Sequence, residues 1–122
     1  MFRVLTALFR SLIFRRISMN WITLIIAGLF EVVWATAMKF SHGFTNLTPT
    51  IITFIGMLIS FFLLAHATKT LPLAIAYPVW TGIGAVGTVI AGIVLFGDKI
   101  SAITWVFVVM LLVSIVGIKM TS

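Results

Sequence analysis

The sequence lacks cysteine and contains only two acidic residues, Glu31 and Asp98. Without cysteine, the chain has no disulfide framework, no thiolate metal site and no cysteine nucleophile. Charged residues make up 8% of the chain, whereas an average soluble domain has about 25%. An ordinary water-soluble fold is therefore excluded, and lipid is the expected environment of most of the chain.

The motifs of ATP-driven pumps and of common hydrolases are also missing. The sequence has no phosphate-binding GxxxxGK, no paired metal ligands and no Ser/His/Asp set. Its two histidines, His42 and His66, are far from any carboxylate in sequence and are interpreted as solvated side chains near helix ends. We therefore expect a protein that is not an enzyme and that has no metal site.

Hydrophobic residues make up 62% of the chain. A helix of about 20 mostly apolar residues spans a hydrocarbon core of about 30 Å. Four stretches have this character, over about residues 21–38, 49–67, 73–96 and 103–118. Because every backbone group must be satisfied internally in lipid, the sequence predicts an all-α membrane protein with four transmembrane helices per subunit.

The N-terminus is basic and apolar. Half of the eight basic residues lie in the first 16 positions, at Arg3, Arg10, Arg15 and Arg16. Because the rest is nearly neutral, the net charge of +6 does not indicate a nucleic-acid partner. Residues 1–18 form a basic amphipathic helix at the membrane interface, or Met19 is the true first residue. In either case, residues 19–122 are the predicted four-helix transporter domain.

Glu31 lies near the middle of the first apolar stretch. An ionised side chain at that depth costs about 2.5 to 3.5 kcal/mol on insertion scales. We expect Glu31 to bind and release a proton near neutral pH and so to act as a proton carrier. The alternative is a permanently neutral Glu31 that donates one hydrogen bond to another helix. Asp98, by contrast, adjoins Lys99 in a predicted loop, where a local ion pair is expected.

Small and aromatic residues surround Glu31 at helical spacing. Positions three and four residues away share its face, which places Ala27, Gly28, Trp34 and Ala35 beside it. Small residues allow another helix or a ligand to approach, and Trp34 provides an aromatic wall. A carboxylate beside an aromatic face is suited to a cation.

The second and third apolar stretches contribute further candidates. Tyr77, Trp80, Gly84 and Gly87 follow one helical stripe; either they pack in the core, or the polar atoms of the two aromatic residues face Glu31. Ser60 either bonds to the carbonyl four residues before it or joins the Glu31 network. Pro78 and the nearby glycines permit a kink or hinge, and small residues also mark tight helix packing.

One ionisable group in the membrane is too little for a translocation path, so two copies are expected. Lys69 and Lys119 fall on one predicted side of the membrane, and Lys39 and Lys99 fall on the other. Lysine and arginine set the orientation of a membrane protein, and here they have no bias. The chain is predicted to insert both ways and to form an antiparallel dimer with inverted symmetry. If residues 1–18 are translated, their arginines fix the N-terminus inside, and an oppositely oriented partner chain is needed.

Four segments, GLFEVVWATAMKFSHGF, ATKTLP, AYPVWTGIGAVG and GIKMTS, resemble the guanidinium-exporter branch of the small multidrug resistance family over residues 19–122. The resemblance implies an antiparallel dimer in the bacterial cytoplasmic membrane, the inner membrane, that exchanges protons for guanidinium or a small guanidinyl cation. Its partners would be that cation, protons, lipid and a second subunit, with the proton gradient in place of a cofactor. It implies that Glu31 is the shared proton and substrate site, in a pocket lined by Gly28, Trp34, Ser60, Tyr77 and Trp80.

The chain departs from that branch at three positions. Ile75 and Pro78 stand where exporters of this branch usually read GTAYAVW, and Ser114 stands where glycine is common. The more apolar Ile75 is typical of the multidrug branch. Export of quaternary ammonium cations and a role as one subunit of a heterodimeric pair are therefore alternatives. A third is a non-transporting assembly or regulatory subunit, which would leave the buried Glu31 without a purpose.

Overall fold

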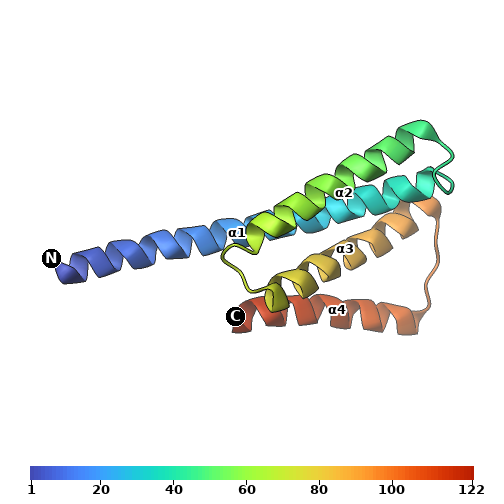
Figure 1. Cartoon of the computed structure of the whole chain (residues 1–122). Helices are drawn as coiled ribbons and strands as arrows, with labels where there is room; N and C mark the ends of the chain where they lie inside the picture. The colour runs from blue at the N-terminus through green and yellow to red at the C-terminus, as the bar shows by residue number, and fades with distance from the viewer.

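The computed structural model covers residues 1–122 and describes the side chains of all residues except 13, 14, 16 and 17. Its four helices alternate in direction (Figure 1). Each contains a stretch that is long and apolar enough to cross a membrane. The predicted all-α fold with four membrane spans is confirmed, in helices α1 (Phe2–Phe40), α2 (Leu47–Ala67), α3 (Leu73–Phe96) and α4 (Ala102–Thr121).

Helix α1 is longer than the apolar stretch from which it was predicted. It runs for 39 residues without a break, and its N-terminal part projects beyond the other helices (Figure 1). Phe2, Leu5 and Phe9 are exposed there. The side chain of Arg16 lies outside the described residues. The helix is continuous across residues 18 and 19. The predicted division into an N-terminal extension, residues 1–18, and a transporter domain, residues 19–122, stays a prediction.

The boundaries of the other helices follow local chemistry. Pro49 lies in the first turn of α2, where its missing N–H has no helical partner to lose. Gly97 ends α3 in the left-handed conformation, with a φ of 67°, which glycine adopts without strain. The Ser101 side chain caps α4 by accepting a hydrogen bond from the Thr104 backbone N–H.

Helix α1 packs against both α2 and α3, whereas α4 packs along α3. Ile115 is the one buried residue of α4. Near the C-terminal end of α4, the Lys119 ammonium lies 5.2 Å from the centroid of the Trp21 ring, a cation–π contact with the middle of α1. Most of the apolar surface of α4 is thus exposed in the single subunit.

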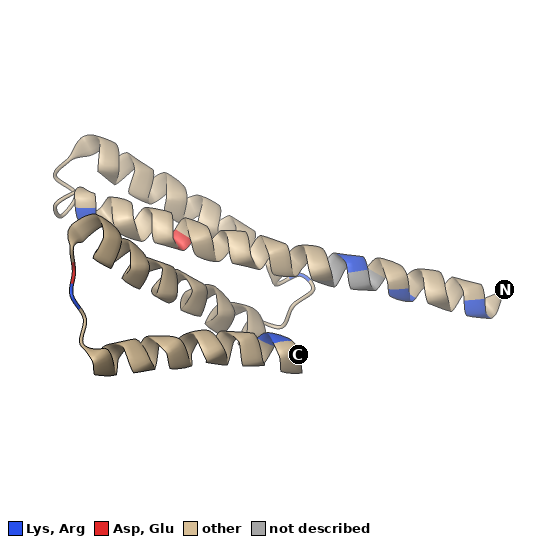
Figure 2. Ribbon diagram, turned by 180° about the vertical axis from the view of Figure 1, so that it is seen from behind, with Lys and Arg blue, Asp and Glu red and all other residues tan. Residues whose placement is uncertain are grey.

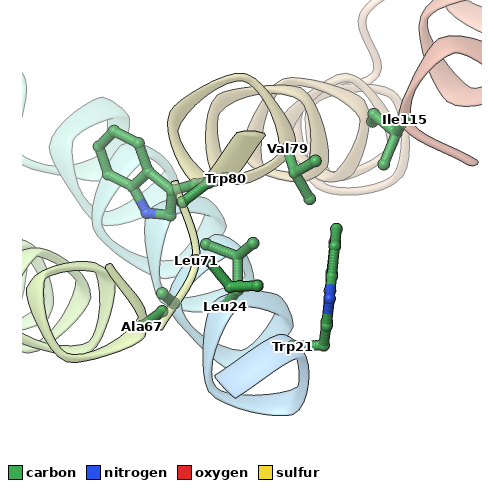
Figure 3. Packing of buried hydrophobic residues seen from close by; sticks show 9 residues of the cluster. Trp21, Leu24, Ala67, Leu71, Val79, Trp80 and Ile115 are labelled. Carbon is green, nitrogen blue, oxygen red and sulfur yellow. The ribbon is translucent and has the colours of Figure 1, made fainter. Parts of the chain in front are cut away.

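The core lies toward one end of the bundle, where the middle of α1 meets the end of α2 and the first turns of α3. Asn20 donates a hydrogen bond to Thr70 at this end, which ties α1 to the loop between α2 and α3. Figure 2 shows basic residues at both ends of the bundle and along the projecting N-terminal part of α1. Figure 3 shows the buried cluster, whose labelled members are Trp21, Leu24, Ala67, Leu71, Val79, Trp80 and Ile115.

Candidate functional site

Glu31 is half-buried on the side of α1 that meets α3. A side chain at Gly84 would overlap the Glu31 carboxyl group, since the Cβ position there is 2.8 Å from Glu31 Cγ. The Glu31 Oε2 atom and the Trp34 indole Nε1 atom are both buried without a hydrogen-bond partner. Buried polar atoms nearly always have a partner. The two residues lie one helical turn apart, and their unpartnered polar atoms make this part of α1 the candidate site.

Glycines bring the helices close together around Glu31. A Cβ atom at Gly28 would lie 2.7 Å from Ile83 Cγ2 of α3, and one at Gly56 of α2 would lie 3.1 Å from Trp34 Cβ. A methyl group at Gly28 would require Ile83 to shift, and one at Gly56 would make a contact tighter than usual with Trp34. The predicted site residue Gly28 thus sets the distance between α1 and α3 and lets Glu31 reach the α3 backbone.

Ser60 connects three helices. Its hydroxyl donates to the Ala27 carbonyl of α1 at 2.7 Å and accepts a hydrogen bond from the Trp80 Nε1–H of α3 at 2.9 Å. Ser60 is fully buried, and Trp80 is 6% exposed. Of the two alternatives for Ser60, the bond to the carbonyl of its own preceding turn is not found, because the hydroxyl donates to α1 instead. Because Ala27 precedes Glu31 by one turn, this network lies directly beside the carboxylate site.

Tyr77 lies farther out than the other predicted site residues. It is 53% exposed in the single subunit, and its ring centroid lies 5.6 Å from that of Trp80, with 53° between the ring planes. The structure thus brings Ser60, Trp80 and Tyr77 into contact, with Tyr77 on the outside, and places Gly28 against α3 near Trp80. Glu31 and Trp34 lie one and two turns farther along α1, against Gly84 of α3 and Gly56 of α2. Sequence reasoning did not find the Ala27 carbonyl, because a backbone acceptor has no signature in the sequence.

Replacing Ser60 by alanine is expected to destabilise the protein by about 1 kcal/mol, because the buried Trp80 N–H loses its acceptor. Ser114→Ala is the matched control, since the Ser114 hydroxyl donates to Met110 of its own helix from an exposed position. Unfolding in mild detergent measures the difference. Equal unfolding midpoints for the two variants would contradict a structural role for this network.

The family model described as Small Multidrug Resistance protein matches residues 19–112. The chain belongs to the small multidrug resistance family. The resemblance seen in its motifs is therefore confirmed, and this family member is a multi-pass membrane protein. Among the described residues, no group of three or more His, Cys, Asp or Glu side chains lies close enough to hold a metal ion.

Curated relatives match the family domain almost from end to end. A protein of Yersinia pseudotuberculosis named guanidinium exporter is 55% identical over 104 residues, which cover 85% of this chain and 100% of that protein. The guanidinium exporter of Escherichia coli strain K12 is 49% identical and is covered over 99% of its length. That of Proteus vulgaris is 48% identical and is covered completely.

Proposed function

We propose that this small multidrug resistance protein exports guanidinium, or a small guanidinyl cation, across the bacterial cytoplasmic membrane in exchange for protons. The observation that carries the proposal is the unpartnered Glu31 carboxyl oxygen inside a membrane span. A planar guanidinium can donate two parallel hydrogen bonds to one carboxylate. The names of the relatives, guanidinium exporters, support this choice of cation.

Coupling follows from competition for one carboxylate. Glu31 binds either a proton or a cation, so arrival of one requires departure of the other. The Trp34 indole, one turn away, supplies a face on which a flat cation can lie. Gly84 leaves the space in which the Glu31 carboxyl group now sits. A cation there would be surrounded by α1 and α3, away from bulk water.

A second subunit is part of the proposal. From residue 19 onward the lysines are balanced, with Lys69 and Lys119 at one end of the bundle and Lys39 and Lys99 at the other, which supports insertion of residues 19–122 in both orientations. Where residues 1–18 are translated, their four arginines fix the N-terminus inside, and the partner is an oppositely oriented chain. The exposed apolar surface of α4 supplies a face on which two subunits can meet. Two antiparallel copies, or this chain with a paired family member, would bring two Glu31 groups to one chamber. Neither an enzymatic step nor a cofactor is required, because the proton gradient supplies the energy.

The coupled exchange is tested with purified protein in proteoliposomes. An imposed pH gradient is expected to drive guanidinium uptake, and a proton ionophore is expected to abolish it. Guanidinium uptake at the same rate with and without the pH gradient would disprove proton coupling. In the same preparation, cation addition in detergent should release protons; no release with any cation would favour a non-transporting subunit.

Quaternary ammonium export is the second candidate, favoured by Ile75 and by the exposed aromatic Tyr77 beside Trp80. Quaternary cations donate no hydrogen bond to a carboxylate and would depend on cation–π contacts. Growth assays separate the two functions. Protection of cells from benzalkonium-like compounds but not from guanidinium would replace the first assignment by the second.

Gly84→Ala is expected to weaken guanidinium binding about tenfold, because the added methyl group displaces the Glu31 carboxyl group. A loss of about 1.4 kcal/mol corresponds to that factor. The fold should survive, since the displaced atoms are at the end of a flexible side chain. Gly117→Ala adds the same methyl group to α4, where a Cβ atom meets nothing within 4 Å in the single subunit, and controls for an effect on the proposed subunit contact. Titration calorimetry checks both variants; unchanged affinity in Gly84→Ala would show that the carboxyl group need not occupy this position.

A further inference from the structure

A cavity of about 630 Å³ opens at the end of the bundle opposite the buried core. The last turns of α1 and α3 and the two following loops form its walls. Because α1 and α3 end together there, at Phe40 and Phe96 whose ring centroids are 4.8 Å apart, the cavity rim lies at the depth of lipid headgroups. Its lining includes Lys39, His42, Phe44, Thr88, Phe96 and Asp98.

Asp98 is held against the C-terminal end of α3. Gly97 turns the chain back with a φ of 67°, and the Asp98 backbone N–H donates to the Gly92 carbonyl at 3.1 Å. The carboxylate then lies so close to Gly92 that a Cβ atom there would be 2.7 Å from Asp98 Oδ2. Negative charge at a helix C-terminus is unfavourable, so this placement does not stabilise α3.

The expected ion pair between Asp98 and Lys99 is not found. In the part of the chain whose side chains are described, no lysine nitrogen lies within 4.0 Å of the Asp98 carboxylate. Lys39 lines the same cavity and is likewise without an ion-pair partner among the described residues. The cavity therefore has one negative and one positive side chain, each available to a ligand.

Opposite charges in one cavity select the kind of ligand. A simple cation drawn to Asp98 would be repelled by Lys39, and a simple anion would be repelled by Asp98. A zwitterion satisfies both groups. The volume is far larger than a guanidinium ion of a few atoms and is typical of sites for larger organic molecules. The depth of the rim and the aromatic walls at Phe44 and Phe96 favour a lipid as the source of that zwitterion.

We propose that this cavity binds the headgroup of a zwitterionic phospholipid with a primary ammonium group, of the phosphatidylethanolamine class. The ammonium lies between the Asp98 carboxylate and the free carbonyls at the C-terminal end of α3, where the helix dipole favours positive charge. The phosphate lies toward Lys39 and His42. The first carbons of the acyl chains contact Phe44 and Phe96. The cavity adjoins the Glu31 site, because its lining includes Ala35 one turn after Glu31, but Glu31 itself does not line it. The proposal does not depend on the proposed transport function.

The loop after α1 is shaped to place His42 at this rim. His42 and Phe44 have φ values of 48° and 67°, a conformation that residues other than glycine keep only when their surroundings hold them. Ser41 supplies that support, because its hydroxyl donates to the Met38 carbonyl and accepts from the Phe44 backbone N–H. The side of the cavity that carries His42 and Phe44 is thus positioned by the loop's own hydrogen bonds.

The test compares three phospholipids whose headgroups differ in charge and in hydrogen-bond donors. A primary ammonium donates hydrogen bonds to Asp98, a choline group donates none, and a phosphatidylglycerol headgroup has no positive charge. The full chain is purified in mild detergent, exposed to an equimolar mixture of the three lipids, and analysed for retained lipid by native mass spectrometry. Phosphatidylethanolamine is expected to exceed phosphatidylcholine about fivefold, the factor for one partly exposed ionic contact.

Two variants should remove the preference in different ways. Asp98→Asn deletes the negative charge, and Gly92→Ala keeps the charge but displaces the carboxylate. Lys39→Gln should lower retention of every phospholipid about fivefold. Lys99→Gln is the control, because Lys99 does not line the cavity. If Asp98→Asn fails to fold, Gly92→Ala decides the question.

Equal retention of the three lipids by the unmodified chain would overturn the proposal. So would a preference that survives both Asp98→Asn and Gly92→Ala, or retention of soluble phosphoethanolamine without any retained lipid. Guanidinium binding is measured on the same variants and should not change. Absence of guanidinium binding in the unmodified chain would instead count against the proposed transport function. It would not affect the conclusion about the lipid site.

Discussion

Glu31→Gln is expected to abolish guanidinium binding and transport. Glutamine keeps the shape of the side chain but cannot become negative, so the two charge-assisted hydrogen bonds to the cation are lost. Each such bond contributes about 1.5 to 3 kcal/mol, and the affinity should fall by about 100-fold or more. Calorimetric binding in detergent and uptake into proteoliposomes measure the two effects.

Two further variants make that result specific. Glu31→Asp keeps the carboxylate with a shorter reach and should retain residual binding. Asp98→Asn removes the other acidic residue, which follows α3 outside the membrane spans, and should bind guanidinium normally. Guanidinium uptake that persists unchanged in Glu31→Gln would show that another group carries both the cation and the proton.

The affinity for guanidinium is expected to fall as the pH is lowered. The cation binds the deprotonated form of Glu31, and protons compete for the same oxygens. At pH values where Glu31 is already mostly protonated, each displaced proton lowers the apparent affinity about tenfold per pH unit. In a dimer, two interacting Glu31 groups would make this fall in affinity steeper. The titration would then belong to the pair and not to either carboxyl group alone.

The pH profile of binding also predicts the profile of transport. At acid pH the site is filled by protons and binds cations poorly. At alkaline pH it binds cations well but lacks protons for the exchange, so turnover should pass through a maximum. Affinity is measured from acid to alkaline pH in the unmodified chain and in Glu31→Gln. A flat affinity profile in the unmodified chain would mean that Glu31 is not the coupling group.

The number, position and lipid environment of the helices could be predicted from the sequence alone. Hydrophobic length is a local property, and proline and glycine mark helix ends through their own backbone chemistry. The third apolar stretch was therefore predicted with the bounds that the structure gives, Leu73–Phe96. Glu31 could be singled out for the same reason, because the free energy of burying a carboxylate depends on its surroundings of apolar residues and needs no knowledge of the fold.

The partners of the candidate site residues depended on how the helices pack. Ser60 was predicted either to bond within its own helix or to reach the site, and only the packing of three helices shows that it joins Ala27 to Trp80. Tyr77 was expected inside and lies 53% exposed in the single subunit. Helix rotation and crossing distance decide such contacts, and these depend on pairs of residues far apart in sequence, such as Gly28 with Ile83.

The loop at the end of α3 also shows which features follow from the sequence and which follow from the tertiary structure. The sequence by itself determined that Asp98 follows a helix and adjoins Lys99, from which a local ion pair was the natural expectation. The tertiary structure decided otherwise, because the left-handed turn at Gly97 directs Asp98 back onto Gly92 and into the cavity beside Lys39. Sequence patterns report which residues prefer lipid or a turn, whereas the direction of a short polar side chain depends on the backbone geometry and neighbours of the folded chain.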